Sequence, residues 1–338
     1  MARTRAVTVR PALAACRSSV VRPTTAGVRV SVSEAAQRLR AGDLVAIPTE
    51  TVYGLAGRAL DEGAVARIFE TKGRPRFDPL IVHVSSAAAV EPLARALPAR
   101  FADLAEAFWP GPLTLVLEKS DRVPDLVTAG APTVAVRVPG LELTRALLDA
   151  VGEPLAAPSA NRFGRLSPTT PDAVEAQLGA ELPVLDGGPC PVGVESTIVS
   201  LAHDPPLLLR PGGVSVEALA PHLPGLRRAA ADELATASPG RLPQHYAPAT
   251  PMRWDDGKTP SGRHGALVWS RVPSHLAPER AEILTPSGDP VEAARNLFEA
   301  LRRLDAAKLP VVVVERMPEA GLGLAIADRL QRAMRASS

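Results

Sequence analysis

Residues 61–84, "DEGAVARIFETKGRPRFDPLIVHV", place a helix, a cationic loop and a strand in immediate succession. Val65, Ile68 and Phe69 share one face at helical spacing, and Gly73 follows as a helix stop. The hexapeptide "PLIVHV" is short and apolar, which is typical of a buried strand. The segment therefore predicts one helix-to-strand unit whose connecting loop is positively charged.

The same alternation of helix and strand extends outward in both directions. Upstream, "SVSEAAQRLRAGD" (31–43) predicts a helix with Ser33 as its N-cap, and "DLVAIP" (43–48) predicts a strand. Downstream, predicted strands and helices continue as far as "PLLLRPGG" (206–213). Strands that alternate with helices are typical of an α/β domain, which we expect over residues 29–226.

A second, smaller domain is expected at the C-terminal end. From 227 to 262 the periodicity fails and Pro, Ser and Thr are frequent, so this segment is predicted to be an extended linker. Strands at "GALVWS" and "PVVVVE" and helices at 290–308 and 321–335 then predict a Rossmann-like, doubly wound α/β unit over 263–338.

Composition excludes several classes of protein. The 338 residues carry a formal net charge of +2, so the molecule as a whole is not a polyanion binder. Cys16 and Cys190 are far apart and no histidines form a close pair, which argues against a disulfide scaffold and a zinc site and fits a reducing cytoplasm. No apolar stretch approaches the roughly 18–20 residues of a membrane span. Neither a P-loop nor a G-x-S-x-G elbow is present.

The first 28 residues form a distinct basic segment. Arginines are frequent there, and no acidic residue precedes Glu34. Such a composition is compatible with a transit peptide. We favour a disordered basic leader or an over-extended start, because the rest of the chain is equally rich in Ala, Arg and Pro.

The cationic loop allows three interpretations when it is considered alone. "GRPR" is similar to the core of an AT-hook, which enters a narrow minor groove. Lys72 and Arg74 could instead complement the dipole at a solvated helix C-terminus. The third interpretation is a phosphate clamp, in which lysine supplies a point charge and arginine a bidentate fork. In each case we expect the loop to be exposed.

Four polar segments elsewhere favour the phosphate clamp. "AIPTETVYGL" (46–55) and "LAAPSANRFGRLSPTT" (155–170) each leave an apolar strand with several hydroxyl groups. "GVESTIVS" (193–200) enters a strand, and "LLLRPGGVS" (207–215) ends one on Arg210. Ligands of open α/β sheets bind beyond strand ends, where such segments converge. The sequence therefore predicts a polar crevice at these ends.

Taken together, these motifs resemble the YrdC-like family of L-threonylcarbamoyladenylate synthases. The family signature, K-G-R followed distantly by S-A-N, matches residues 72–74 and 159–161. "SPGRLPQHYAP" and "PEAGLGLAIADRL" resemble the linker and C-terminal domain of the long, two-domain form. The resemblance implies an open twisted mixed α/β sheet with a deep basic crevice.

The resemblance also implies a reaction. L-threonine, bicarbonate (or CO2) and ATP would give threonylcarbamoyl-AMP, pyrophosphate and water, which makes the chain a nucleotidyltransferase. A separate transferase complex would then use the product to make threonylcarbamoyladenosine beside the anticodon of tRNA. We expect a cytoplasmic enzyme without a membrane partner, whose Mg2+ arrives with ATP. Direct binding of tRNA stays open.

By the same resemblance, specific residues are assigned to the site. Those expected around threonine are Thr51, His83, Arg137, Ala157 and Ser196. Those expected around ATP are Lys72, Arg74, Asp78, Thr133, Ser159, Asn161, Ser167, Arg210 and Tyr246. Lys72 and Arg74 are also expected to be catalytic, because fixed cations would stabilise charge on the phosphates and on the departing pyrophosphate. No side chain is expected to ligate a metal.

One departure and two alternatives qualify this interpretation. Asp78 stands where many relatives have asparagine, and a carboxylate would repel phosphate unless it helps to position magnesium. The alternatives are an RNA-binding, translation-associated module of the same fold and a carbamoyl-transfer relative with another acceptor. An RNA-binding module should bind RNA with a steep dependence on salt.

Overall fold

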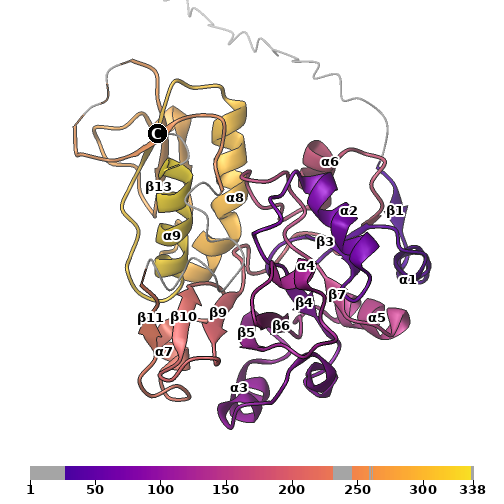
Figure 1. Ribbon diagram of the computed structural model, residues 1–338. Coiled ribbons are helices and arrows are strands. Elements are labelled where there is room, and N and C mark those ends of the chain that lie inside the picture. Colours follow the sequence, from indigo (N-terminus) through magenta and orange to yellow (C-terminus); the bar gives the residue numbers. More distant parts are fainter. Residues whose placement is uncertain (1–26, 231–245, 259, 261, 336–338) are drawn as a thin grey trace, which may run out of the picture.

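The computed structural model describes residues 27–230, 246–258, 260 and 262–335. Two bodies lie side by side, each built on its own sheet (Figure 1). The described residues include only two of the predicted leader, 1–28. They also leave out 231–245, the middle of the predicted linker. None of the helices in the described part is both long and apolar enough to cross a bilayer.

The larger body contains an 11-stranded mixed sheet. The sheet contains parallel pairs such as β4–β6 and antiparallel pairs such as β2–β3, so the predicted mixed α/β sheet is confirmed. In spatial order the strands are β1 (Arg29–Val30), β8 (Val184–Leu185), β2 (Val45–Ile47), β3 (Gly54–Arg58), β7 (Leu155–Ala156), β4 (Ile81–His83), β6 (Thr133–Arg137), β5 (Leu113–Glu118), β9 (Thr197–Ser200), β10 (Leu207–Arg210) and β11 (Arg227–Arg228).

Helices cover both faces of the part of this sheet that contains β2, β3 and β7. Because successive strand residues point to opposite faces, Val45 and Ile47 of β2 pack with α1 and α5, whereas Ala46 packs with α2. Leu155 and Ala156 of β7 divide in the same way, whereas Ile81, Val116, Ala135, Ile198, Leu207 and Leu209 form a separate cluster of strand residues together with Ala229. The helices of this body are α1 (Val32–Arg40), α2 (Glu62–Lys72), α3 (Arg100–Phe108), α4 (Asp125–Thr128), α5 (Glu142–Val151), α6 (Pro171–Leu178) and α7 (Val216–Leu219).

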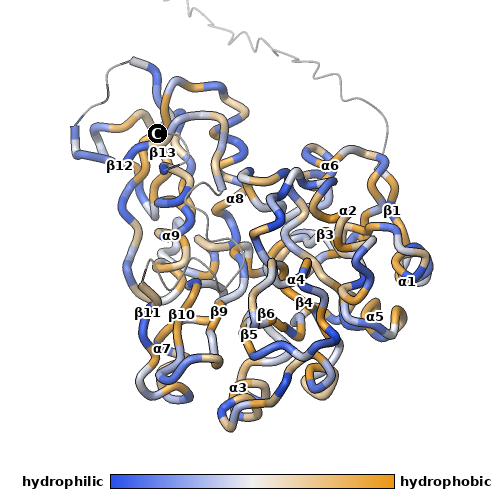
Figure 2. Tube along the Cα trace, viewed as in Figure 1, coloured by the Kyte–Doolittle hydropathy of each residue, from blue (hydrophilic) through white to orange (hydrophobic). Residues whose placement is uncertain are grey.

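The smaller body has four parallel strands in the order β12 (Met252–Trp254), β15 (Val312–Val314), β13 (Gly265–Val268) and β14 (Ala281–Ile283). Its helices are α8 (Pro290–Ala306) and α9 (Leu322–Arg335), and Figure 2 shows hydrophobic and hydrophilic residues alternating along both. β11 belongs to the larger sheet and β12 to the smaller one. Both lie inside the predicted linker, 227–262, because strands of two or three residues leave no periodicity to detect.

The start of α1 differs from the prediction by two residues. Ser31, not Ser33, is the N-cap: its hydroxyl accepts from the Glu34 amide at 3.2 Å. The Glu34 carboxylate accepts in return from the Ser31 amide at 2.8 Å. This reciprocal pair is a capping box, and its S-x-x-E spacing was present in the sequence.

Replacing the cap should destabilise the protein. We expect Ser31→Ala to lower the free energy of unfolding by about 1 kcal/mol, because an amide of the first helical turn loses its acceptor. Urea denaturation followed by circular dichroism measures the loss. Ser33→Ala is the matched control and should change the free energy by less than about 0.5 kcal/mol, as is usual for an exposed site. A larger effect at Ser33 would contradict the assignment.

Candidate active site

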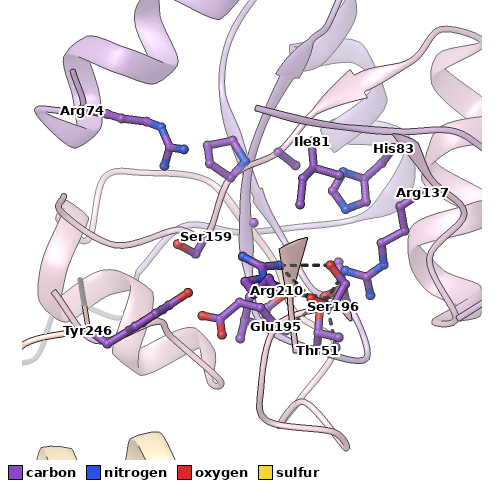
Figure 3. Close-up of a pocket in the computed structure, with 15 residues that line it drawn as sticks. Thr51, Arg74, Ile81, His83, Arg137, Ser159, Glu195, Ser196, Arg210 and Tyr246 are labelled. Atoms are coloured by element: carbon purple, nitrogen blue, oxygen red, sulfur yellow. Dashed lines mark hydrogen bonds between the residues drawn. The ribbon is translucent and has the colours of Figure 1, made fainter. Parts of the chain in front are cut away.

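Several strand ends converge on one crevice (Figure 3). Arg137 ends β6 and Arg210 ends β10, while Ser196 immediately precedes β9. The residues that line the crevice are Thr49, Thr51, Val52, Gly54, Arg74, Ile81, His83, Arg137, Ala157, Pro158, Ser159, Glu195, Ser196, Arg210 and Tyr246. The crevice thus gathers segments that are distant in sequence.

Arg137 is held by three partners at the end of its strand. Its Nη2 atom lies 2.6 Å from Glu50 Oε1, and its Nη1 donates to the Thr51 hydroxyl at 3.0 Å. Its Nε donates to the Gly111 carbonyl at 3.2 Å. Glu50 was not predicted from the sequence, although it lies inside the "PTET" motif. It neutralises a guanidinium that is almost fully buried.

Arg210 is fixed to the segment before β9. Its Nε and Nη2 atoms donate to the Ser196 carbonyl at 3.1 and 3.0 Å, and Nη2 also reaches the Ser196 hydroxyl at 3.2 Å. The Ser196 hydroxyl lies 2.8 Å from that of Thr114. Burial lowers the pKa of Arg210. An arginine nevertheless stays protonated in a protein, so this group is a fixed cation facing the crevice.

The predicted exposure of the loop holds for Arg76 and Phe77 but is wrong for Lys72 and Arg74. Lys72 and Arg74 are only 2% and 6% accessible. Arg74 Nη2 lies 2.9 Å from Asp78 Oδ2 and donates to the Pro79 carbonyl at 2.8 Å, while Nε donates to the Asp78 carbonyl at 3.1 Å. Asp78 therefore fixes a buried cation, which resolves the doubt about a carboxylate in this loop.

Lys72 joins the two signature motifs to each other. Its ammonium group donates to the carbonyls of Ser159, at 2.5 Å, and Asn161, at 2.6 Å. The Phe163 amide donates back to the Lys72 carbonyl at 2.8 Å. Burial, with a smaller effect of Arg74, lowers the pKa of Lys72 well below its ordinary value. Lys72 thus holds the backbone of the loop behind Ser159 and does not line the crevice.

His83 is a neutral side chain in the crevice. Burial and the charge of Arg137 lower its pKa to about 3. Within the part of the chain that the structure describes, its Nδ1 atom has no hydrogen-bond partner. A base is most effective when its pKa is near the working pH, so His83 is suited to hydrogen bonding with a ligand rather than to proton abstraction.

Glu195 is an acidic lining residue that the sequence reasoning missed. Its carboxylate accepts from the Ser167 hydroxyl at 2.5 Å and from Nε of Arg329 at 2.9 Å. Burial alone would raise its pKa, but Arg329 and Arg210 outweigh burial and lower it. Glu195 is therefore ionised. The "VEST" motif contained it, but its partner on α9 lies 134 residues away in sequence.

The structure brings most of the predicted site residues together. Those that line the crevice are Thr51, Arg74, His83, Arg137, Ala157, Ser159, Ser196, Arg210 and Tyr246. Lys72, Asp78, Asn161 and Ser167 lie behind the lining and hold it in place. Thr133 lies at the opposite end of β6 from Arg137, where it lines a separate depression with Phe77 and Lys119.

The fold and the crevice define a class: a two-domain α/β protein with an arginine-rich pocket suited to a small anionic ligand. The Sua5/YciO/YrdC family, described as "Telomere recombination", matches residues 37–212. The threonylcarbamoyl-AMP synthase C-terminal domain matches residues 214–334. The chain belongs to this family.

Individual relatives agree with that assignment over nearly the whole chain. Threonylcarbamoyl-AMP synthase of Pyrococcus abyssi is 42% identical over 320 residues, which are 88% of this chain and 92% of that protein. The Bacillus subtilis enzyme of the same name is 38% identical, covering 89% and 92%. The crystal structure of P. abyssi Sua5 complexed with L-threonine superposes with a TM-score of 0.82 at 38% identity, covering 92% of this chain and 97% of that one.

The position of Lys72 leads to a test of stability. We expect Lys72→Ala to lower the free energy of unfolding by about 2 kcal/mol, because two carbonyls lose their buried donor. Arg76→Ala, in the same loop but exposed, should change it by less than about 0.5 kcal/mol. Urea denaturation of both variants measures the difference. Equal denaturation midpoints for Lys72→Ala and the unmodified protein would contradict the stabilising role of the Lys72 bonds to the Ser159 and Asn161 carbonyls.

The depressed pKa of His83 leads to a second test. Unfolded histidine binds a proton near pH 6.5, whereas His83 resists protonation until about pH 3, so the unfolded state binds more protons between these values. Stability should therefore fall by up to about 1.4 kcal/mol per pH unit below 6.5. His83→Gln should remove this part of the slope. Parallel stability curves for both proteins between pH 7.5 and 4.5 would contradict the assignment.

Proposed function

We propose that this chain is a threonylcarbamoyl-AMP synthase, a nucleotidyltransferase that makes threonylcarbamoyl-AMP from L-threonine, bicarbonate and ATP. The observation that carries the proposal is the convergence of Arg74, Arg137 and Arg210 from three separate segments on one crevice. Membership of the family and the synthase relatives support it. So does the similarity to P. abyssi Sua5, whose crystal structure contains L-threonine.

Threonine would occupy the part of the crevice around Thr51, His83, Arg137, Ala157 and Ser196. Arg137 has five N–H donors, of which Gly111, Thr51 and Glu50 use three. Two donors are left for the carboxylate of the amino acid. The neutral His83 and the Ser196 hydroxyl can orient polar groups of threonine without adding a competing charge.

ATP would occupy the part lined by Arg74, Ser159, Arg210 and Tyr246. The threonine amine would add to bicarbonate with loss of water (or to CO2 with loss of a proton), and an oxygen of the resulting carbamate would then attack the α-phosphorus as pyrophosphate leaves. Arg74 and Arg210 are rigidly held, so they can stabilise the charge on the phosphate oxygens without reorganising. Lys72, Asp78, Asn161 and Ser167 would fix the walls, and Thr133 would meet the nucleotide only where it extends beyond the crevice.

The metal and the later fate of the product complete the proposal. Among the described residues, no group of three His, Cys, Asp or Glu side chains is placed to hold a metal ion. We therefore assign Mg2+ to the phosphates of ATP, since this ion commonly keeps its waters and substrate phosphates as ligands. The product would pass to a tRNA threonylcarbamoyl transferase complex in the cytoplasm.

Release of pyrophosphate from ATP tests the function. We expect release by the full chain only when threonine and bicarbonate are both present, with at least about a tenfold lower rate when serine replaces threonine. A missing methyl group is worth roughly 1–3 kcal/mol in a shaped pocket, which supports a difference of this size. Release without threonine would favour another carbamoyl-transfer reaction. No release, together with salt-sensitive RNA binding, would favour the RNA-binding alternative.

A further inference from the structure

Arg329 belongs to the small domain but contacts residues that line the crevice. It lies on α9 and is fully buried. Its Nε donates to Glu195 at 2.9 Å, and its Nη1 donates to the carbonyl of Pro211 at 2.6 Å. Its guanidinium carbon lies 5.5 Å from the ring centroid of Tyr246. Two of these partners, Glu195 and Tyr246, line the crevice.

The charge of Glu195 is a difficulty for a site that binds ATP. Figure 3 shows its carboxylate between Tyr246 and Arg210, on the side of the crevice below Ser159. An ionised carboxylate near phosphate, in surroundings of low dielectric constant, repels the ligand strongly. The site therefore needs fixed cations that neutralise Glu195. Arg329 and Arg210 both lower its pKa, with the larger effect from Arg329, which also donates to the carboxylate directly.

The docking of the small domain is built around the segment that carries Glu195. Arg302 of α8 donates to the carbonyl of Ser167, and Thr169 donates to Glu299 at 3.1 Å. At Gly193 the backbone approaches α8 so closely that a Cβ would lie 2.3 Å from Cα of Arg295. Val194 packs in the hydrophobic core of the small domain. The contacts between the two domains thus place Arg329 beside Glu195.

We propose that Arg329 is a positioning residue for the nucleotide: it neutralises Glu195 and, with Ser167, holds this carboxylate against the small domain, so that docking of that domain sets the affinity for ATP. This inference rests on the proposed function. Asp328 lies 3.1 Å from Arg329 but is also paired with Arg332 at 2.9 Å, so the charge of Arg329 remains available to Glu195.

A double-mutant cycle tests this proposal. We expect Arg329→Met to raise the KM for ATP, and the Kd for ATP measured by calorimetry, at least tenfold while the KM for threonine changes less than threefold. Glu195→Gln alone should lower the Kd for ATP, because the repelling carboxylate is gone while Arg329 keeps its charge. The double variant should return to within about threefold of the unmodified protein, because no uncompensated carboxylate remains.

Control variants distinguish the effect of an unneutralised Glu195 charge from the effect of weaker docking of the small domain. Arg302→Met removes another docking contact, and adding Glu195→Gln to it should give no rescue. If Arg329→Met does not fold, Arg329→Gln with and without Glu195→Gln completes the same cycle, and the far-ultraviolet spectrum and melting temperature verify the fold. An Arg329→Met/Glu195→Gln protein as impaired as Arg329→Met would overturn the proposal, since a contact through Tyr246 or a structural role would then explain the loss.

Different results would reject the proposed function and the proposed role of Arg329. Calorimetry with ATP alone does not depend on threonine or bicarbonate. An unmodified chain that binds ATP but releases no pyrophosphate would reject the proposed function while the cycle still decides the role of Arg329. An unmodified chain that binds no ATP would reject both.

Discussion

A guanidinium cannot be buried unless its charge and its N–H groups are satisfied, and this constraint organises the molecule. Arg74 is buried with Asp78, Arg137 with Glu50, and Arg329 with Glu195. Each pair joins a crevice residue to a neighbouring segment or to the other domain. The site is thus a rigid set of cations whose positions are fixed before any ligand arrives, which is the condition for effective electrostatic stabilisation of a transition state.

The Lys72 contact extends this constraint to the backbone. The Lys72 side chain donates to the carbonyls of Ser159 and Asn161, and the αL turn at Gly73 separates it from Arg74. Lys72 and Arg74, two residues apart, therefore have different tasks. One supports the wall of the crevice and the other lines it. The same division holds for Ser167, which supports Glu195 from behind.

The interface between the domains gives the small domain a specific relation to the site. Val52, Leu166 and Val194 of the larger body pack in the same hydrophobic cluster as Phe298 and Tyr246. The segments that line the crevice are therefore also the segments on which the small domain rests. A change in the docking of the small domain must shift the residues that line the crevice, because the interior of a protein is close-packed and transmits displacement.

The sequence by itself determined the α/β class, the two bodies and a polar crevice at the strand ends, because helical and strand periodicity and polar segments are local signals. The individual lining residues followed from the resemblance of its motifs to the synthase family. The S-x-x-E capping box was also local, although Ser33 was chosen over Ser31. The tertiary structure decided which of the predicted residues face the ligand. Lys72 lies behind the residues that line the crevice, and Thr133 lies at the end of β6 that is far from the crevice. Glu195 is paired with Arg329 of the small domain. Such pairings join residues far apart in the chain, and only the packing of strand ends and domains determines which buried charge lies beside which.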